Sequence, residues 1–243
     1  MAQQPPALHL VAEGPDLKSE APWVLIYFAL YFGYLWLTLE DEVRHWATLV
    51  IIPFAVLAWL QRNRMGRWEI KQSLTTVGLR KPKWTQSIFW SLVIGLLLSS
   101  LQLVLSRNKG QIWHLLVSEK GVPLFLLAFV FLFLTAGFTE EFFFRGVLQT
   151  RLQALFNSNV LAVLVASILF GLYHLPYAYL HPRWPSHGNW LDAFGAAFGE
   201  AVPIGLILGT VYARSGNNLI PAVIVHSLFD TLPAMASLHI GRT

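Results

Sequence analysis

Two carboxylates and one guanidinium stand at the end of an apolar run that begins near Val122: Glu140, Glu141 and Arg145. A charge at the centre of a bilayer costs at least roughly 2.5–3.5 kcal/mol, so ionisable groups inside a span usually face protein and mark function. Glu141 and Arg145 are spaced i,i+4 and can pair directly, whereas Glu140 lies about 100° around the helix. We therefore expect Glu140 to be the carboxylate left free for chemistry.

Two later hydrophobic segments each bring a histidine to a similar depth. Phe170 and His174 are spaced i,i+4 in one of them, and His226 and Asp230 in the other. A carboxylate and two imidazoles from three helices could hold a divalent metal with one open position, which would activate water and polarise a carbonyl. Alternatively, Glu140 could act on water as a general base without metal, while His226 and Asp230 stabilise the developing oxyanion.

The charge balance of this cluster favours a cation. Four carboxylates and one guanidinium leave three net negative charges if all of them face one cavity: Glu140, Glu141, Glu200, Asp230 and Arg145. Burying that excess is prohibitive unless protons or a cation offset it. We expect a divalent metal, zinc, as the cofactor, with protonation of the same groups as the alternative. The metal ligands would be Glu140, His174, His226 and Asp230.

The supporting residues also have plainer structural roles. Glu141 with Arg145 is more typical of a structural ion pair than of a catalytic one, and a single His174 often only hydrogen-bonds another helix. Glu200, three residues before Pro203, could satisfy backbone groups freed by a kink or pair with Arg145. The combination of three helices, and no single one of them, predicts the chemistry.

The composition indicates a membrane protein. The 243 residues are 55% hydrophobic and only 12% charged, about half the charged fraction of a soluble domain. Ten Trp, seven Tyr and seventeen Phe suit aromatic belts at lipid interfaces. The absence of cysteine excludes disulfides and thiolate metal sites. The net charge of +4 arises beside hydrophobic segments, so we expect a lipid bilayer and no nucleic acid as partner.

The hydrophobic segments predict an all-α polytopic transmembrane bundle of about seven spans, within a range of six to eight. The fourth span is long enough that its later turns should leave the bilayer, and Pro176 should stop the fifth. The spans are expected at residues 22–39, 46–60, 87–105, 122–155, 160–175, 191–213 and 219–239.

Charge and glycine patterns predict the organisation around these spans. Seven Lys/Arg fall in the loop 61–85, which predicts that this loop and the N-terminus lie on the cytoplasmic side. We expect the membrane to be a bacterial-type plasma membrane. Within it, residues 68–79 could form a short amphipathic element. The glycine pairs of the sixth span favour intramolecular packing over a dimer seam, so an oligomer is possible but not required. These pairs are Gly195-x-x-x-Gly199 and Gly205-x-x-x-Gly209.

Three divisions follow along the chain. Residues 1–20 are polar and proline-containing and are expected to be a disordered or surface tail. Residues 21–121 would form N-terminal transmembrane helices around the basic loop. Residues 122–243 would form the catalytic transmembrane core.

The three motifs together resemble those of a known family. The strings Glu140-Glu141-x-x-x-Arg145, Phe170-x-x-x-His174 and His226-x-x-x-Asp230 are similar, in order and in placement on successive hydrophobic helices, to the motifs of the CAAX-processing and bacteriocin-processing intramembrane endopeptidases (CPBP, also called Abi). The stretch from Gly205 to His226 is similar to that family's lead-in to its last motif. The resemblance covers about residues 122–235.

The resemblance implies roles for the motif residues. Glu140 and His174 would activate water. His226 would bind a metal or the oxyanion, with assistance from Asp230. The remaining motif residues would support the site: Glu141, Arg145 and Phe170. The substrate would be a membrane-associated or prenylated protein or a peptide, cleaved near its C-terminus.

The chain departs from the family pattern at its last motif position, where the family most often has Asn and this chain has Asp230. An ionised acid binds metal well but donates no hydrogen bond to an oxyanion. This substitution weakens the metal-free role of the position and leaves the metal role intact.

Two other functions compete with hydrolysis. One is a non-catalytic immunity or binding member of the same family. The other is a proton- or cation-coupled transporter that uses the buried Glu, His and Asp. The zincin, serine-nucleophile and Walker A motifs are all absent from the sequence. Loss of peptide cleavage on substitution of Glu140 or His174 would favour the protease over both alternatives.

Overall fold

The computed structural model of the chain describes residues 16–80, 84–106, 108–182 and 184–240. These residues form helices and loops with no strand among them, which confirms the predicted all-α class. The elements, with η marking π-helical stretches, are α1 (Leu17–Leu35), α2 (Glu42–His45), η1 (Trp46–Ile51), α3 (Ile52–Met65), α4 (Ile70–Thr76), α5 (Trp84–Leu105), α6 (Lys109–Leu116), α7 (Gly121–Leu134), α8 (Ala136–Glu141), η2 (Phe142–Gln149), α9 (Thr150–Phe156), α10 (Asn159–Leu180), α11 (Trp190–Phe194), η3 (Gly195–Ala201), α12 (Val202–Arg214) and α13 (Leu219–Ile240).

Six helical stretches of the described chain are long and apolar enough to cross a membrane: 43–65, 86–105, 121–156, 159–180, 190–214 and 219–236. They correspond to the second through seventh predicted spans. The first predicted span corresponds to α1, a helix of 19 residues whose side chains Trp23, Ile26 and Leu30 are exposed. This helix is not among the six stretches, but exposed apolar side chains of this kind mark a contact with protein or membrane. The predicted multi-pass bundle is therefore confirmed.

The first helix begins earlier than predicted. The side chain of Asp16 caps α1 by accepting a hydrogen bond from the N–H of Ser19 at 3.2 Å. Residues 17–20, assigned from their polarity to the tail, form the first turn of this helix, and Glu20 in it is fully buried. Residues 1–15 of the predicted tail lie outside the described part of the chain.

The fifth span does not end where proline predicted. Helix α10 continues through Pro176 to Leu180. Proline removes one backbone hydrogen bond inside a helix, but transmembrane helices tolerate it where neighbouring protein surrounds the freed groups. Here Leu175 and the three residues that follow it are all buried, so packing overrides the local signal.

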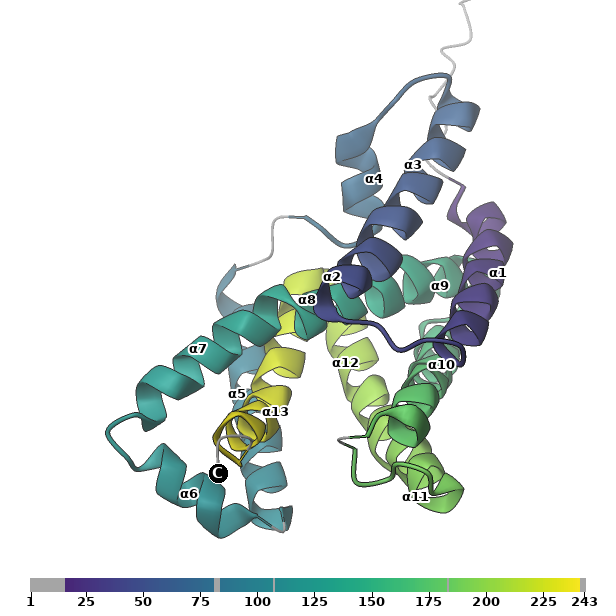
Figure 1. Cartoon of the computed structure of the whole chain (residues 1–243). Coiled ribbons are helices and arrows are strands. Elements are labelled where there is room, and N and C mark those ends of the chain that lie inside the picture. The colour runs from purple at the N-terminus through teal and green to yellow at the C-terminus, as the bar shows by residue number, and fades with distance from the viewer. Residues whose placement is uncertain (1–15, 81–83, 107, 183, 241–243) are drawn as a thin grey trace, which may run out of the picture.

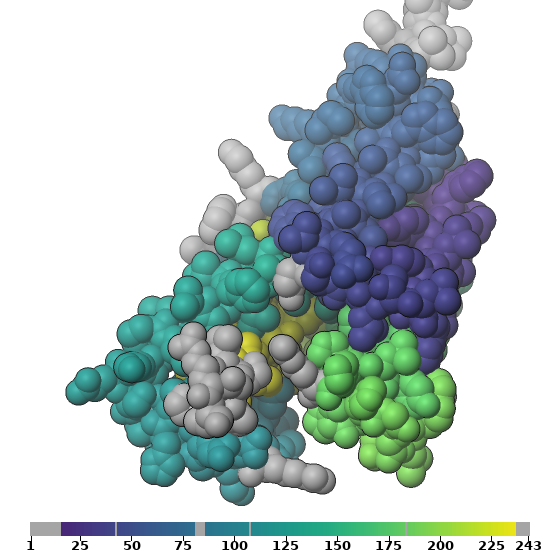
Figure 2. Space-filling view, viewed as in Figure 1, coloured from purple at the N-terminus to yellow at the C-terminus, as the bar shows by residue number. Residues whose placement is uncertain are grey.

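The bundle is built around two central helices (Figure 1). Helix α13 packs against α5 and α7, and α10 packs against α12, η3 and α9. The α5–α13 contact is close, because a Cβ on Gly95 would lie 2.6 Å from Leu228, and Ser99 donates a hydrogen bond of 2.6 Å to the Leu228 carbonyl. Between the teal part of the chain and the green part the surface is hollowed, and α13 is visible at the bottom (Figure 2).

Successive loops lie at alternate ends of the bundle. At one end, three hydrogen bonds join segments distant in sequence: Arg64 to the Asp16 carbonyl (3.0 Å), Asn217 to Gln153 (2.7 Å), and the N–H of Leu219 to the Gly78 carbonyl (3.1 Å). At the other end, Trp36 lies against Trp190 with ring centroids 5.5 Å apart. This alternation is what a chain that crosses a membrane with each long helix requires.

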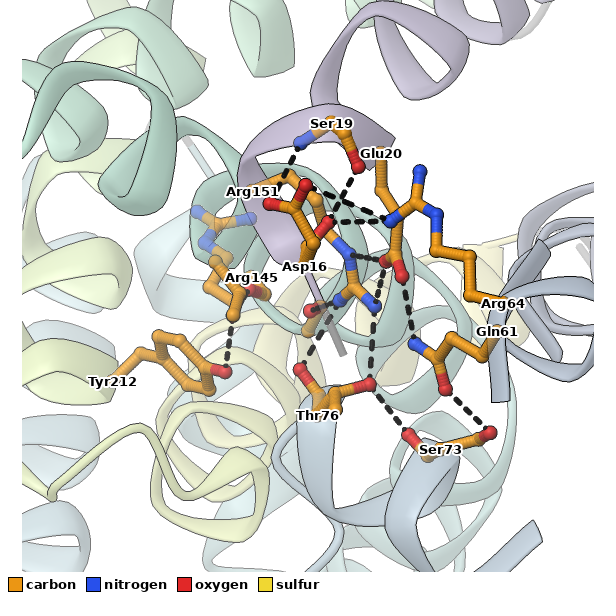
Figure 3. Close-up of polar contacts among 12 residues, drawn as sticks. Asp16, Ser19, Glu20, Gln61, Arg64, Ser73, Thr76, Arg145, Arg151 and Tyr212 are labelled. Atoms are coloured by element: carbon orange, nitrogen blue, oxygen red, sulfur yellow. Dashed lines mark hydrogen bonds and ion pairs between the residues drawn. The ribbon is translucent and has the colours of Figure 1, made fainter. Parts of the chain in front are cut away.

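A buried polar network ties α1 to the first of these ends (Figure 3). The guanidinium of Arg151 donates to the Glu20 carboxylate at 2.9 and 3.1 Å and to the Thr76 carbonyl at 3.1 Å. Gln61 donates to the other Glu20 oxygen at 3.1 Å, and Ser73 donates to Gln61 at 2.6 Å. Ser73 and Thr76 belong to α4, a helix within the amphipathic element predicted at 68–79.

The fourth span changes character at Thr135, where the backbone leaves the helical region (φ −111°, ψ −111°). Helix α7 before it exposes Val122, Leu126 and Leu127. After it, every residue from Thr139 to Leu152 is buried. Other helices of the protein enclose these later turns, and η2 winds there as a π-helix, a form frequent at functional sites. That the later turns leave the bilayer stays a prediction.

The two glycine pairs of the sixth span behave differently. A Cβ on Gly205 would lie 3.1 Å from Ser167, and one on Gly209 would lie 2.7 Å from Gln149, so this pair packs inside the chain as predicted. No described atom lies within 4 Å of a Cβ placed on Gly195 or Gly199. Close intramolecular packing therefore holds for only the second pair.

Candidate active site

The structure brings the acid of α8 and the imidazoles of α10 and α13 together. Glu140 Oε2 lies 3.8 Å from Nε2 of His174 and 3.9 Å from Nε2 of His226. The residues Glu140 and His226 are buried, and the His174 side chain is 18% exposed. Glu140 Oε2 is buried and has no hydrogen-bond partner among the described residues. A carboxylate oxygen thus faces two imidazole nitrogens at the point where three helices meet.

Glu141 connects Arg145 to His226. Its Oε1 atom lies 3.0 Å from Arg145 Nη1 along the same helical stretch and 2.8 Å from His226 Nδ1 across to α13. Arg145 also donates to the Gly205 carbonyl of α12 at 3.2 Å. Because a carboxylate only accepts hydrogen bonds, His226 must carry its proton on Nδ1 to bond with Glu141. The Arg145–Glu141 pair predicted from spacing therefore also sets the ring orientation of His226.

Local helix geometry sets the tautomer of His174. Its Nδ1 lies 2.8 Å from the Phe170 carbonyl oxygen, four residues earlier in α10. A carbonyl accepts, so Nδ1 donates, and the neutral ring presents an unprotonated Nε2 toward Glu140. The Phe170 ring lies edge-on to His174 at 4.5 Å and under the Arg145 guanidinium at 4.5 Å. Phe170 thus separates the cation from the imidazole and contacts both.

Asp230 is the most open member of the cluster. Its Oδ2 atom lies 3.2 Å from His226 Nε2, and its side chain is 34% exposed. Next to it along α13, Phe229 and Pro233 line a cavity of about 960 Å³ between α5, α13 and the η3–α12 helix. The cavity thus borders α13 at the residues next to Asp230.

Glu200 lies apart from the other predicted site residues. It is exposed on η3 and lines the same cavity. The carboxylate that pairs with Arg145 is that of Glu141, at 3.0 Å, and not that of Glu200 as considered from the sequence. Counting Glu200 within one closed cluster overstated the buried negative charge.

The donors of the cluster suit a divalent metal in their chemistry. Carboxylates and imidazoles are ordinary zinc ligands, and the unpartnered Oε2 of Glu140 faces two of them. Among the described residues, however, no group of three His, Asp or Glu side chains is arranged to hold a metal ion. The donor set therefore fits a metal, although its geometry is not preformed.

A second buried polar group adjoins the cluster and was missed from the sequence. The Tyr173 hydroxyl donates to Glu140 Oε1 at 3.4 Å and lies 3.3 Å from Nε2 of His45. The same nitrogen lies 2.7 Å from the Tyr177 hydroxyl. Farther along, Tyr31 donates to Glu40 at 2.9 Å. The i,i+4 spacing of Tyr173 and Tyr177, beside His174, was the available signal; nothing local pointed to His45, 128 positions from Tyr173.

Comparison with known proteins bears on the same region. Residues 122–232 match the family model described as type II CAAX prenyl endopeptidase Rce1-like. The matched segment contains all three motifs, which confirms the family resemblance predicted from them. No curated protein and no solved structure matches the chain. At the family level the match supports an intramembrane endopeptidase of the CAAX type, in a multi-pass integral membrane protein.

Proposed function

We propose that this chain hydrolyses a peptide bond near the C-terminus of a membrane-associated or prenylated protein or peptide, with Glu140 as the base that activates water. The observation that carries the proposal is the unpartnered Glu140 Oε2, which lies 3.8 and 3.9 Å from the Nε2 atoms of His174 and His226. These separations are too long for direct hydrogen bonds and are the kind that one water bridges.

The chemistry follows from the donor and acceptor states of these groups. A water between Glu140 and His174 can donate one hydrogen to Oε2 and the other to the unprotonated Nε2. As the water oxygen attacks the scissile carbonyl carbon, its proton passes to Glu140. The same proton is then donated to the leaving amine nitrogen when the C–N bond breaks.

The oxyanion formed in this step needs a hydrogen-bond donor. Nδ1–H of His226 is donated to Glu141 at 2.8 Å, so a proton on Nε2, 3.9 Å from Glu140 Oε2, would give the ring a second N–H donor. Asp230 Oδ2, 3.2 Å from the same nitrogen, can accept that N–H and so holds the ring in place. Asp230 therefore assists through His226, and the oxyanion needs no hydrogen bond from Asp230 itself.

A divalent metal, zinc in the first instance, is the alternative to the protonated His226, because a metal would take the place of the proton on Nε2. Its ligands would be drawn from Glu140, His174, His226 and Asp230, and when bound it would polarise the scissile carbonyl. Metal analysis of purified wild-type protein against His226→Ala tests this point. About one ion per chain in the wild type and its loss in the variant are expected of a zinc site. Equal content in both proteins would exclude His226 as a ligand.

Cleavage itself is tested by substitution in purified, detergent-solubilised protein. Glu140→Gln and His174→Ala should abolish hydrolysis of a C-terminal peptide substrate while the thermal unfolding temperature stays near that of the wild type. Matched controls are Glu69→Gln and His187→Ala, which change the same residue types outside the cluster and should leave turnover unchanged. Retained hydrolysis in Glu140→Gln would remove Glu140 as the base.

A comparison of protein C-termini in cells can identify the substrate directly. Membrane-protein C-termini are compared by mass spectrometry in cells that contain the wild-type protein or Glu140→Gln. Shortened C-termini that depend on Glu140 identify the substrate and show whether it is prenylated. Identical C-termini in both cell lines would favour the non-catalytic or transport alternatives.

A further inference from the structure

One oxygen of Glu140 is held by a tyrosine and the other is free. Oε1 accepts a hydrogen bond from the Tyr173 hydroxyl at 3.4 Å, whereas Oε2 has no hydrogen-bond partner among the described residues. Tyr173 is 1% exposed, and its ring packs on those of Tyr31 and Phe144 with centroids 6.1 and 5.1 Å away. Its hydroxyl therefore has little freedom to turn away from Glu140.

The Tyr173 hydroxyl also contacts His45. A hydroxyl has one proton, so when Tyr173 donates to Glu140 its oxygen is left able only to accept from another group. His45 Nε2, 3.3 Å away, is in position to donate. The same Nε2 lies 2.7 Å from the Tyr177 hydroxyl, so this one nitrogen is shared between two hydroxyls of α10. His45 is itself buried.

We propose that His45 and Tyr173 are positioning residues of the active site, which orient Glu140 so that Oε2 faces the imidazoles of His174 and His226. This inference rests on the proposed function of Glu140. It assigns a part in catalysis to α2, which lies outside the segment 122–232 that matches the endopeptidase family. The N-terminal helices would then complete the site and not merely surround it.

The first variant removes only the hydroxyl. In Tyr173→Phe the ring packing is kept and Oε1 loses its donor, so the Glu140 carboxylate can rotate. We expect kcat to fall at least about tenfold, the effect of one hydrogen bond to a charged group, with KM within about twofold because the substrate route is untouched. The matched control is Tyr212→Phe, which removes a fully buried hydroxyl bonded to Thr150 at 2.7 Å away from the cluster.

Variants of His45 test whether it acts through Tyr173. His45→Leu removes the donor and should lower kcat as Tyr173→Phe does, whereas His45→Gln retains an N–H donor and should recover part of the loss. The double variant Tyr173→Phe/His45→Leu should be no slower than Tyr173→Phe alone. Additive losses, or no difference between His45→Leu and His45→Gln, would mean that His45 serves packing only.

A spectroscopic readout separates this inference from the proposed function. The infrared band of the Glu140 carboxyl group, assigned by its disappearance in Glu140→Gln, should shift in Tyr173→Phe and in His45→Leu and stay in place in Tyr212→Phe. An unshifted band overturns the positioning role whether or not the protein cleaves a peptide. If the band shifts but the wild type cleaves nothing, the hydrogen-bond chain stands and the hydrolytic function fails.

Discussion

At the scale of the residue, Glu141 is the side chain on which the other charges depend. It is fully buried, forms an ion pair with Arg145 at 3.0 Å and accepts a hydrogen bond from His226 at 2.8 Å. Removing one partner of a buried ion pair leaves an uncompensated charge, which costs roughly 3–5 kcal/mol. We expect Arg145→Gln to lower the free energy of unfolding by about that amount, measured by denaturant titration in detergent micelles.

The control for this prediction is an exposed pair of the same type. Arg67 lies 2.8 Å from Glu69, and the Arg67 side chain is 73% exposed. Arg67→Gln should cost no more than about 1 kcal/mol, because solvent screens an exposed pair and hydrates the remaining carboxylate. Equal losses for the two arginines would show that burial does not govern the Arg145–Glu141 pair.

At the scale of the element, close contact between α10 and the η3–α12 helix positions His174. A Cβ on Gly171 would lie 2.5 Å from Val202 and 2.6 Å from the backbone oxygen of Ala197. Backbone cannot yield as a side chain can, so Gly171→Ala should push the helices apart, lower the thermal unfolding temperature by several degrees and reduce turnover.

The same substitution elsewhere on these helices should have the opposite effect on stability. A Cβ on Gly195 meets no described atom within 4 Å, and alanine favours a helix over glycine by about 0.5–1 kcal/mol. Gly195→Ala should therefore leave the unfolding temperature equal or slightly raised. A large drop in Gly195→Ala would indicate that this face packs against another copy of the chain, as its glycine spacing allows.

At the scale of the whole molecule, the two ends of the bundle predict a topology. The loop that carries Gly66 lies at the end where Arg64 bonds to Asp16, and the seven Lys/Arg of residues 61–85 lie in it or beside it along the chain. We expect this end to face the cytoplasm. The chain has no cysteine, so single cysteines report directly on sidedness. Gly66→Cys should react with an impermeant thiol reagent only after the membrane is opened, and Ser118→Cys should react in intact cells.

The reverse labelling pattern would mean that the bundle has the opposite orientation in the membrane, with its fold unchanged. Labelling of both positions from one side would mean that the chain between them crosses the membrane an even number of times. That result would contradict the single predicted crossing by α5.

Much of this protein follows from sequence alone, because much of it is local helix geometry. Apolar length predicts the spans, and i,i+4 spacing predicts that Glu141 pairs with Arg145 and that His174 and Phe170 share a face. Local signals failed where packing outweighed them. Helix α10 passes Pro176 because protein surrounds that turn, and residues 17–20 are helical because Arg151 neutralises the buried Glu20.

Only the tertiary structure decided which groups of different helices meet. Glu141 and His226 are 85 positions apart, and His45 and Tyr173 are 128 apart. No periodicity within a helix encodes such a pair, since it depends on the rotation and depth at which packed helices settle. The sequence therefore determined which side chains could do chemistry. Packing determined which of these side chains contact one another, and it left Glu200 outside the cluster.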